Sequence, residues 1–230
     1  MAAFVLHFPV SAQDYPSIAP SAVFTSPDGE EQQGAEYSGS APVRARFTSG
    51  VSGADGWEAY YEWRFYAEGV AEPYLVRREE DTEYTFTTAG AHTVKLYATF
   101  SQGADTLYYT DEYWAGAEPL RITVSESKLE MPNAFSPNGD GINDIYKAKE
   151  GYRSIVEFDA AIYSRWGQRL YRWSDPAGGW DGKVDGRDAA QGVYYVLVKA
   201  KGADERRFNI RRDVNLLRGY TEKEAVASDE

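Results

Sequence analysis

Apolar and polar residues alternate along most of the chain, or apolar residues come in short runs bounded by Gly, Pro, Asp, Asn and Ser. Residues 84–87 and 94–98 show the alternation most clearly. A spacing of two is typical of strands with one buried face, whereas the spacing of three to four that a helix needs is nearly absent. The pattern therefore predicts an all-β fold.

Five strands are expected in the first half of the chain, from about residue 14 to residue 127: Val43–Thr48, Ala59–Tyr66, Glu83–Thr88, His92–Phe100 and Leu120–Val124. The third and fourth are separated by a short connection in which Gly90 can adopt a positive φ. We therefore expect these two strands to form a hairpin with one buried face and one solvated face.

The first half also carries a Trp within an aromatic run, Tyr61–Phe65. In immunoglobulin-like sandwiches, a Trp on a central strand fills the space between the two sheets. Together with Glu83–Leu96, this run resembles a polycystic-kidney-disease (PKD) or related Ig-like domain. The Gly-Asp pair that such domains often carry after the Trp strand is missing. The resemblance implies an Ig-like sandwich over residues 14–127.

The polar segment Ser125–Met131 is interpreted as a linker to a second domain, residues 128–218. Five more strands are expected there: Asp144–Lys149, Val156–Trp166, Gln168–Trp173, Gly192–Lys201 and Arg206–Leu217. In the fourth, Val193, Tyr195 and Leu197 share one face, while the other face is also apolar. This strand is therefore expected to be central and covered on both sides.

Turn-rich motifs follow one another through the second half. They are PNAFSPNGDGIND at 132–144, AIYSRWGQ at 161–168, WDGK at 180–183, QGVYYV at 191–196 and VNLLR at 214–218. The segment 166–168 is predicted to form a tight turn between two strands. The Asp181 side chain is expected to form a hydrogen bond with the backbone two residues further on. In this order and spacing, the series resembles the gliding motility-associated C-terminal domain, a type B sorting domain of the type IX secretion system of Bacteroidetes.

The resemblance implies an Ig-like antiparallel sandwich, recognition by the type IX secretion machinery and delivery to the cell surface or the medium. The residues that match the family motif are Pro137, Asn138, Gly139, Asp140, Gly141, Asn143, Asp144, Arg165, Trp166, Gly167, Trp180, Asp181, Gly182, Gly192, Tyr194, Leu217 and Arg218. The family usually ends near its Leu-Leu-Arg segment, whereas a polar tail, residues 219–230, follows here. A tail of this kind would interfere with sorting if the exporter reads a free C-terminal strand.

The net charge limits the classes of binding partner, and the cysteine content limits the chemistry that the chain can perform. The net charge is −12 at pH 7, which disfavours nucleic acids and anionic bilayers because both are bound mainly through Lys and Arg. Without any Cys, disulfides and thiol catalysis are excluded.

Residues 1–13 are interpreted as a signal peptide that is cleaved after Ala12. It is interpreted as truncated, because no Lys or Arg precedes the short apolar run. No other segment has the roughly 18 apolar residues of a membrane helix.

Two interpretations are open for the loop that holds Asn138, Asp140, Asn143 and Asp144. Its side-chain oxygens and its glycines suit Ca²⁺, which prefers Asp, Asn and carbonyl oxygens. The bidentate Glu of an EF-hand is missing at the expected distance. The favoured alternative is a turn in which the Asn and Asp side chains bond backbone N–H groups.

The chain is interpreted as non-enzymatic. Its two His, His7 and His92, cannot build a Ser-His-Asp set or an HExxH pair, and His92 is expected at a solvent-exposed edge. The acidic run Glu79–Asp81 is expected in a solvated loop. A pair of catalytic carboxylates, as in glycoside hydrolases, is the distant alternative.

The aromatic run Leu107–Trp114 is the best candidate for an exposed ligand patch, with Tyr108, Tyr109, Tyr113 and Trp114 as its members. The favoured function is a surface structural or adhesion component exported by the type IX system. The alternative is a carbohydrate-binding module delivered the same way, because exposed aromatic rings stack on sugars. An exposed linear row of aromatic rings would favour that alternative.

Overall fold

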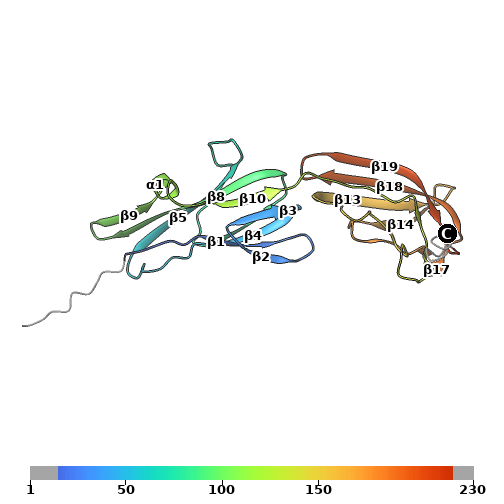
Figure 1. Ribbon diagram of the computed structural model, residues 1–230, viewed down its shortest axis with the longest axis horizontal. Helices are drawn as coiled ribbons and strands as arrows, with labels where there is room; N and C mark the ends of the chain where they lie inside the picture. Colours follow the sequence, from blue (N-terminus) through green and yellow to red (C-terminus); the bar gives the residue numbers. More distant parts are fainter. Residues whose placement is uncertain (1–14, 220–230) are drawn as a thin grey trace, which may run out of the picture.

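The computed structural model describes residues 15–219. The chain forms two β-sandwiches that follow one another along an elongated molecule (Figure 1). Apart from one short helix, the ordered structure is strand, so the predicted all-β fold with two consecutive antiparallel sandwiches is confirmed. The predicted signal peptide and all but the first residue of the predicted tail lie outside the described residues.

The first sandwich has one sheet of four antiparallel strands in the order β2-β1-β4-β7. Its strands are β1 (Ser21–Thr25), β2 (Glu31–Gly34), β4 (Val43–Thr48) and β7 (Thr82–Phe86). Side chains on β4 alternate between buried and exposed along its whole length, as the period of two predicted.

The second sheet of this sandwich has the order β3-β10-β8-β5-β6, with β9 paired to the far end of β8. Its strands are β3 (Glu36–Gly39), β5 (Glu58–Ala67), β6 (Leu75–Arg77), β8 (Gly90–Gln102), β9 (Asp105–Tyr109) and β10 (Leu120–Val124). The β3–β10 pair is parallel and all others are antiparallel. The helix α1 (Asp111–Trp114) lies between β9 and β10.

Aromatic side chains fill the space between the two sheets. Trp63 is fully buried, as the Ig-like pattern predicted, and its indole N–H donates to the Glu80 carbonyl oxygen at 3.0 Å. Phe47 from the opposite sheet packs on it with ring centroids 5.6 Å apart. The buried donor is thus satisfied, which avoids the cost of an unpaired polar group in the core.

The predicted hairpin around Gly90 is wrong. β7 pairs with β4, and β8 pairs with β5 and β10, so the connection crosses from one sheet to the other. Phe86 on β7 and Val94 on β8 are both buried in the same core. Alternation shows that each strand has a buried face, but it does not show whether the two faces lie in one sheet or oppose each other.

The second sandwich is built on a five-stranded sheet in the order β11-β19-β18-β13-β14. The strands are β11 (Ala134–Phe135), β13 (Ile155–Tyr163), β14 (Arg169–Trp173), β18 (Gly192–Gly202) and β19 (Arg207–Leu216). Two small pairs complete the domain: β12 (Tyr146–Lys147) with β15 (Gly179–Trp180), and β16 (Lys183–Val184) with β17 (Arg187–Asp188). A separate core contains the fully buried Tyr146 and Trp180.

Strand β18 is central, as predicted, because it lies between β19 and β13. However, the expectation that both of its faces are covered is wrong. Val196 and Val198 point into the core, whereas Val193 and Tyr195 are each 49 % exposed. The small strand pairs and loops of this sandwich cover only one face of the large sheet, which leaves the other face to solvent.

The segment between the sandwiches is held at several points. The Ser127 hydroxyl donates to Asp204 Oδ1 at 2.6 Å. The backbones of Lys128 and Arg153 form an isolated antiparallel β-bridge. These contacts hold the segment predicted as a linker against the second sandwich. Among the described residues, no helix has the length and apolarity to cross a bilayer.

Candidate functional site: the motif-bearing end of the second sandwich

The sequence motifs of the second half meet at the end of the domain that lies away from the first sandwich. Strand register shows why: Tyr163, which ends β13, pairs with Tyr195 near the start of β18, and Gly192 pairs with Leu216 near the end of β19. The hairpin tip at 164–168, the start of β18 and the end of β19 therefore share one end of the sheet. We call it the motif end.

Arg218 connects three of the motifs. Its guanidinium donates to the Ala189 carbonyl oxygen at 3.1 Å, to that of Pro137 at 3.1 Å and to that of Gly182 at 2.7 Å. Asp188 Oδ1 lies 3.4 Å from Arg218 Nη2. Five N–H donors in a rigid fork suit this role, because one Arg can join several carbonyls that a Lys could not reach together.

Gly182 makes the close approach to Arg218 possible. It has a φ of +76°, and a Cβ added there would lie 2.9 Å from Pro137 Cγ and 3.3 Å from Arg218 Nη2. Next to it, Asp181 Oδ1 accepts the Lys183 backbone N–H at 3.0 Å, which confirms the predicted turn. The turn is anchored in the core because the Trp180 indole N–H donates to the Lys183 carbonyl oxygen at 2.7 Å.

The loop at residues 137–144 is closed by its own side chains. Asp144 Oδ1 accepts the Gly139 N–H at 2.7 Å, and its Oδ2 accepts the Gly141 N–H at 2.8 Å. These two bonds hold the pKa of the Asp144 carboxyl below its ordinary value, because they stabilise the charged form.

The other oxygens of this loop are also acceptors: Asn138 Oδ1 receives the Asp140 N–H at 3.0 Å, and Asp140 Oδ1 receives the Ile142 N–H at 2.9 Å. This is the arrangement of the favoured turn interpretation. Among residues 15–219 there is no group of three or more His, Asp or Glu that could hold a metal ion. Calcium binding stays a prediction.

The hairpin tip displays a large aromatic side chain. Gly167 has a φ of +80°, and Ser164 is bonded across the turn, its N–H donating to the Gln168 carbonyl oxygen at 2.9 Å. The predicted tight turn between β13 and β14 is thus confirmed. Trp166 is 84 % exposed at this tip, with the Arg165 guanidinium 5.3 Å from its ring centroid. An exposed Trp is the kind of side chain that anchors protein interfaces.

The remaining motif residues support the motif end from within. The Tyr194 ring packs on Trp180 with centroids 5.1 Å apart, and its hydroxyl donates to the Ala190 carbonyl oxygen at 2.7 Å. The Leu217 N–H donates to the Phe135 carbonyl oxygen at 3.0 Å. All five motifs thus contribute to one end of the domain, although they are spread over 87 residues, from 132 to 218.

Sequence reasoning missed the partners of Arg218, because Asp188 and the Ala189 carbonyl group belong to a segment without an obvious signal, and nothing local links Arg218 to the motifs that hold Pro137 and Gly182. One signal was present. Arg218 follows Leu216 and Leu217 at the end of a strand, and a charged group next to buried positions needs hydrogen-bond acceptors close by.

The aromatic patch expected at residues 107–114 is not exposed as a unit. Trp114 is buried, and its indole N–H donates to the Leu96 carbonyl oxygen at 3.0 Å. The Tyr109 hydroxyl donates to the Pro16 carbonyl oxygen at 2.7 Å, and Tyr113 packs between Tyr109 and Trp114. Only Tyr108, 64 % exposed, faces solvent freely. Here α1 turns the chain back onto the sheet, which the strand-like alternation did not predict.

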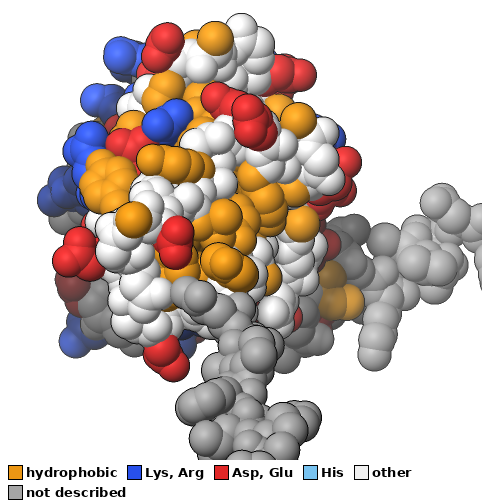
Figure 2. Space-filling model, turned by 90° about the vertical axis from the view of Figure 1, so that its left-hand side faces the viewer, with side chains coloured by type: hydrophobic (Ala, Val, Ile, Leu, Met, Phe, Trp, Pro, Cys, Tyr) orange, Lys and Arg blue, Asp and Glu red, His pale blue; other side chains and the backbone are white. Residues whose placement is uncertain are grey.

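The end of the first sandwich is shown in Figure 2, where hydrophobic side chains gather near the middle of the face. The aromatic residues exposed in this part of the molecule include Tyr15 and Tyr108. They belong to separate segments and form no linear row along a strand.

The structure also shows where the other sequence candidates lie. His92 is buried, not at a solvent-exposed edge: its Nδ1 lies 3.2 Å from the Tyr74 hydroxyl and its Nε2 lies 3.0 Å from the Thr88 carbonyl oxygen. Phe86 and Tyr74 pack around it, which explains the correction. Glu79–Asp81 lie in an exposed loop, as expected. His7 lies outside the described residues.

Fold and motif end together define an all-β chain with a compact, motif-bearing sandwich at its C-terminal side. Residues 129–210 match the model of a protein family described as the CHU_C type IX secretion signal domain. The match confirms the predicted C-terminal sorting domain and supports a protein targeted to the type IX secretion system, hence export to the cell surface or the extracellular space. It also implies an interaction with the type IX secretion machinery. No curated protein matches the chain.

Proposed function

We propose that the second sandwich directs export of the chain through the type IX secretion system, and that the machinery contacts the motif end. The first sandwich, which we interpret as PKD-like, is the non-enzymatic cargo and acts as a structural or adhesion component at the cell surface. The observation that carries the proposal is the convergence of all five motifs on one end of the domain, away from the first sandwich.

Different parts of the motif end have different roles in this proposal. The Arg218 bonds to Pro137, Gly182 and Ala189 hold the loops in place. Trp166 makes no comparable contribution to folding, since most of its surface is exposed. A side chain that is large, apolar and exposed at a fixed turn is suited to bind a partner.

The experiment measures export of the full chain, with a host signal peptide in place of residues 1–13, in a bacterium that has type IX secretion. Trp166→Ala is expected to leave the protein folded in the periplasm and to reduce the exported fraction at least several-fold. Folding is checked by circular dichroism and by the thermal unfolding midpoint of the purified variant.

Tyr171→Ala is the matched control, because Tyr171 lies on the same hairpin, on β14, and is also exposed. It is expected to be exported like the parent chain. If the Trp166 variant is folded and exported as efficiently as the parent, the proposed contact at the hairpin tip is wrong.

The carbohydrate-binding alternative stays a prediction. Its distinguishing feature, an exposed row of aromatic rings, is not formed by the described residues of the 107–114 run.

A further inference from the structure

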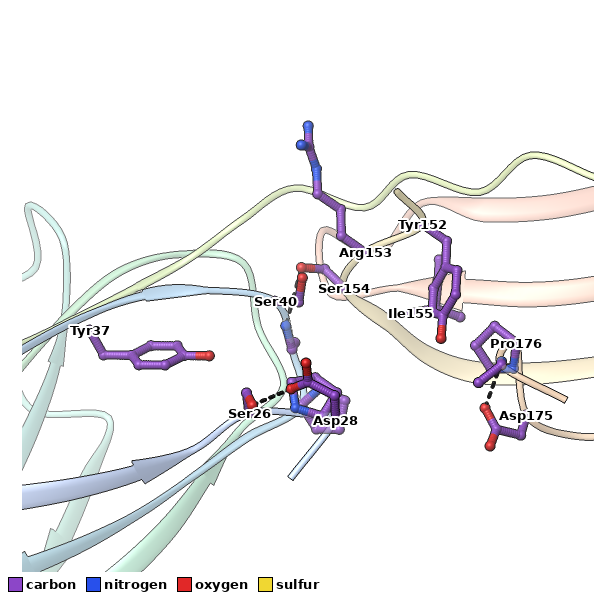
Figure 3. A pocket seen from close by; sticks show the side chains of 14 residues that line it. Ser26, Asp28, Tyr37, Ser40, Tyr152, Arg153, Ser154, Ile155, Asp175 and Pro176 are labelled. Atoms are coloured by element: carbon purple, nitrogen blue, oxygen red, sulfur yellow. Dashed lines mark hydrogen bonds between the residues drawn. The ribbon is translucent and has the colours of Figure 1, made fainter. Parts of the chain in front are cut away.

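A cleft of about 560 Å³ lies between the two sandwiches (Figure 3). The first sandwich contributes the β1–β2 turn at residues 26–28, Tyr37 and the segment 40–42. The second contributes residues 152–155, at the start of β13, and the turn at 175–177. Neither sandwich forms this cleft alone. Its volume is in the range of small-ligand sites.

The walls are fixed by hydrogen bonds across the joint. The Ala41 N–H donates to Ser154 Oγ at 3.2 Å, and Ser154 Oγ lies 2.8 Å from Ser125 Oγ. Nearby, the Ala89 N–H donates to the Ala203 carbonyl oxygen at 2.9 Å. These bonds hold the two halves of the cleft in register, so a ligand finds a preformed site and loses less free energy in ordering it.

Tyr37 directs an unused polar group into the cleft. Its side chain is only 8 % exposed, and Figure 3 shows its hydroxyl directed toward the cleft from the first sandwich. Among residues 15–219, no hydrogen-bond partner is found for this hydroxyl. Gly39 makes room for it, because a Cβ added at Gly39 would lie 2.5 Å from the Tyr37 oxygen. The hydroxyl can therefore bond a ligand in the cleft without first breaking a hydrogen bond inside the protein.

The charge in the cleft is negative and uncompensated. Asp28 lies on one wall and Asp175 on the other, and neither forms an ion pair within the described part of the chain. The only cation in the lining is Arg153, whose guanidinium points away from the cleft in Figure 3, with Nε donating to the Glu126 carbonyl oxygen. Burial, Asp175 and Asp28 together raise the pKa of Tyr152, in keeping with a negative potential on its side of the cleft.

We propose that this cleft binds a lysine or arginine side chain of a peptide ligand. The charged head group donates hydrogen bonds to the Asp28 carboxylate and to the Tyr37 oxygen, which can act as an acceptor, while Asp175 on the opposite wall attracts it through its charge. The methylene stem lies along the apolar part of the lining, which includes Pro27, Pro42 and Pro176. A neutral sugar could also contact these groups, but it would leave two carboxylates uncompensated. The proposal does not depend on the export role of the second sandwich.

The test titrates the purified full chain with the tripeptides Gly-Lys-Gly, Gly-Arg-Gly and Gly-Gln-Gly, and with the neutral sugar cellotriose, followed by isothermal calorimetry and by NMR shifts of Tyr37 and Tyr152. We expect saturable binding of the two basic peptides with a Kd of about 1 mM or tighter, and much weaker binding of Gly-Gln-Gly. Higher salt should weaken binding because the contact is electrostatic.

The double variant Asp28→Asn with Asp175→Asn keeps the shape of the cleft and removes both charges, so it should lose at least tenfold in affinity. Tyr37→Phe should lose several-fold, because only the hydroxyl is removed. The matched control is Asp185→Asn, since Asp185 lies at the β16–β17 turn, outside the cleft, and it should bind like the parent. Equal binding of Gly-Gln-Gly, no basic-peptide signal at millimolar concentration, or preference for cellotriose would each overturn the proposal.

Discussion

Single residues at the motif end have roles that differ with their surroundings. Gly182 and Gly186 both have a positive φ, of +76° and +75°. A Cβ at Gly182 would meet Pro137 and Arg218, whereas a Cβ at Gly186 would meet nothing within 4 Å. Comparing the two positions therefore separates the cost of backbone strain, which both share, from the cost of crowding at the Arg218 contacts.

We expect Gly182→Ala to destabilise the second sandwich more than Gly186→Ala does, by about 1–3 kcal/mol. The reason is that Pro137 or the Arg218 guanidinium must move to admit the methyl group, which weakens the bonds that join three motifs. Urea unfolding followed by Trp fluorescence gives both values. Equal unfolding free energies for the two variants would contradict the role given to Gly182.

The carboxyl group of Asp144 should determine how the loop at residues 137–144 responds to acid. Its pKa is lowered in the folded state by the Gly139 and Gly141 N–H groups. A lowered folded pKa means that the stabilising effect is present above the ordinary carboxyl pKa of 3.8 and is lost as pH falls through the lowered value. The loop should therefore stay closed at pH 4 and open only in stronger acid.

The measurement is an NMR titration of the Gly139 and Gly141 amide shifts. Both should move together, with a midpoint below 3.8. Asp144→Asn, which keeps an acceptor but does not ionise, should remove this shared transition. A shared midpoint at or above the ordinary value would show that the two bonds do not form in solution.

At the scale of elements, the period of two predicted where the strands lie in the sequence better than it predicted which strands pair with each other. β4 and β10 have the predicted bounds, and β5, β13, β14, β18 and β19 differ by at most three residues at either end. These strands have a buried face that fixes their alternation. β1 and β9 were not predicted, although β1 alternates between buried and half-buried positions.

The predictions of strand pairing and of side-chain burial failed where these depend on contacts between residues far apart in the sequence. The chain passes from one sheet to the other between β7 and β8, and it does so because the two sheets face each other across the core. His92 can be buried because Tyr74, from another segment, supplies one of its two hydrogen-bond partners. Trp114 is buried because α1 folds it back under Leu96. None of these contacts leaves a local pattern, so the alternation of residues cannot predict them.

For the candidate site, the sequence motifs contain the residues that the structure brings together, but they did not predict that these residues contact one another. The Asp181 turn and the turn at Gly167 follow from local chemistry, since an Asp bonds the backbone two residues on and a Gly accepts a positive φ. That Arg218 joins Pro137, Gly182 and Ala189 depends on strand register over the whole domain, which no single motif contains.

At the scale of the whole molecule, charge divides between the two halves. Residues 14–127 contain 7 Lys and Arg against 19 Asp and Glu, whereas residues 128–218 contain 16 against 13. The acidic net charge thus resides mainly in the first sandwich, and the sorting sandwich is close to neutral. A difference in charge of this size is in keeping with the separate roles proposed for the two sandwiches.

The elongated arrangement places the motif end and the first sandwich at opposite sides of the joint (Figure 1). A partner that binds the motif end therefore does not have to displace the cargo. The second sandwich has its own core, separate from that of the first, so it should carry its function to an unrelated cargo.

The most direct test fuses Lys128–Arg218 to a fluorescent protein that bears a signal peptide, in a host with type IX secretion, with and without Gly219–Glu230. We predict fluorescence at the cell surface or in the medium for at least the version that ends at Arg218, and periplasmic retention of the fluorescent protein alone. A difference between the two fusions would measure the effect of the tail. Retention of both fusions in the periplasm would contradict the central claim that this sandwich directs export.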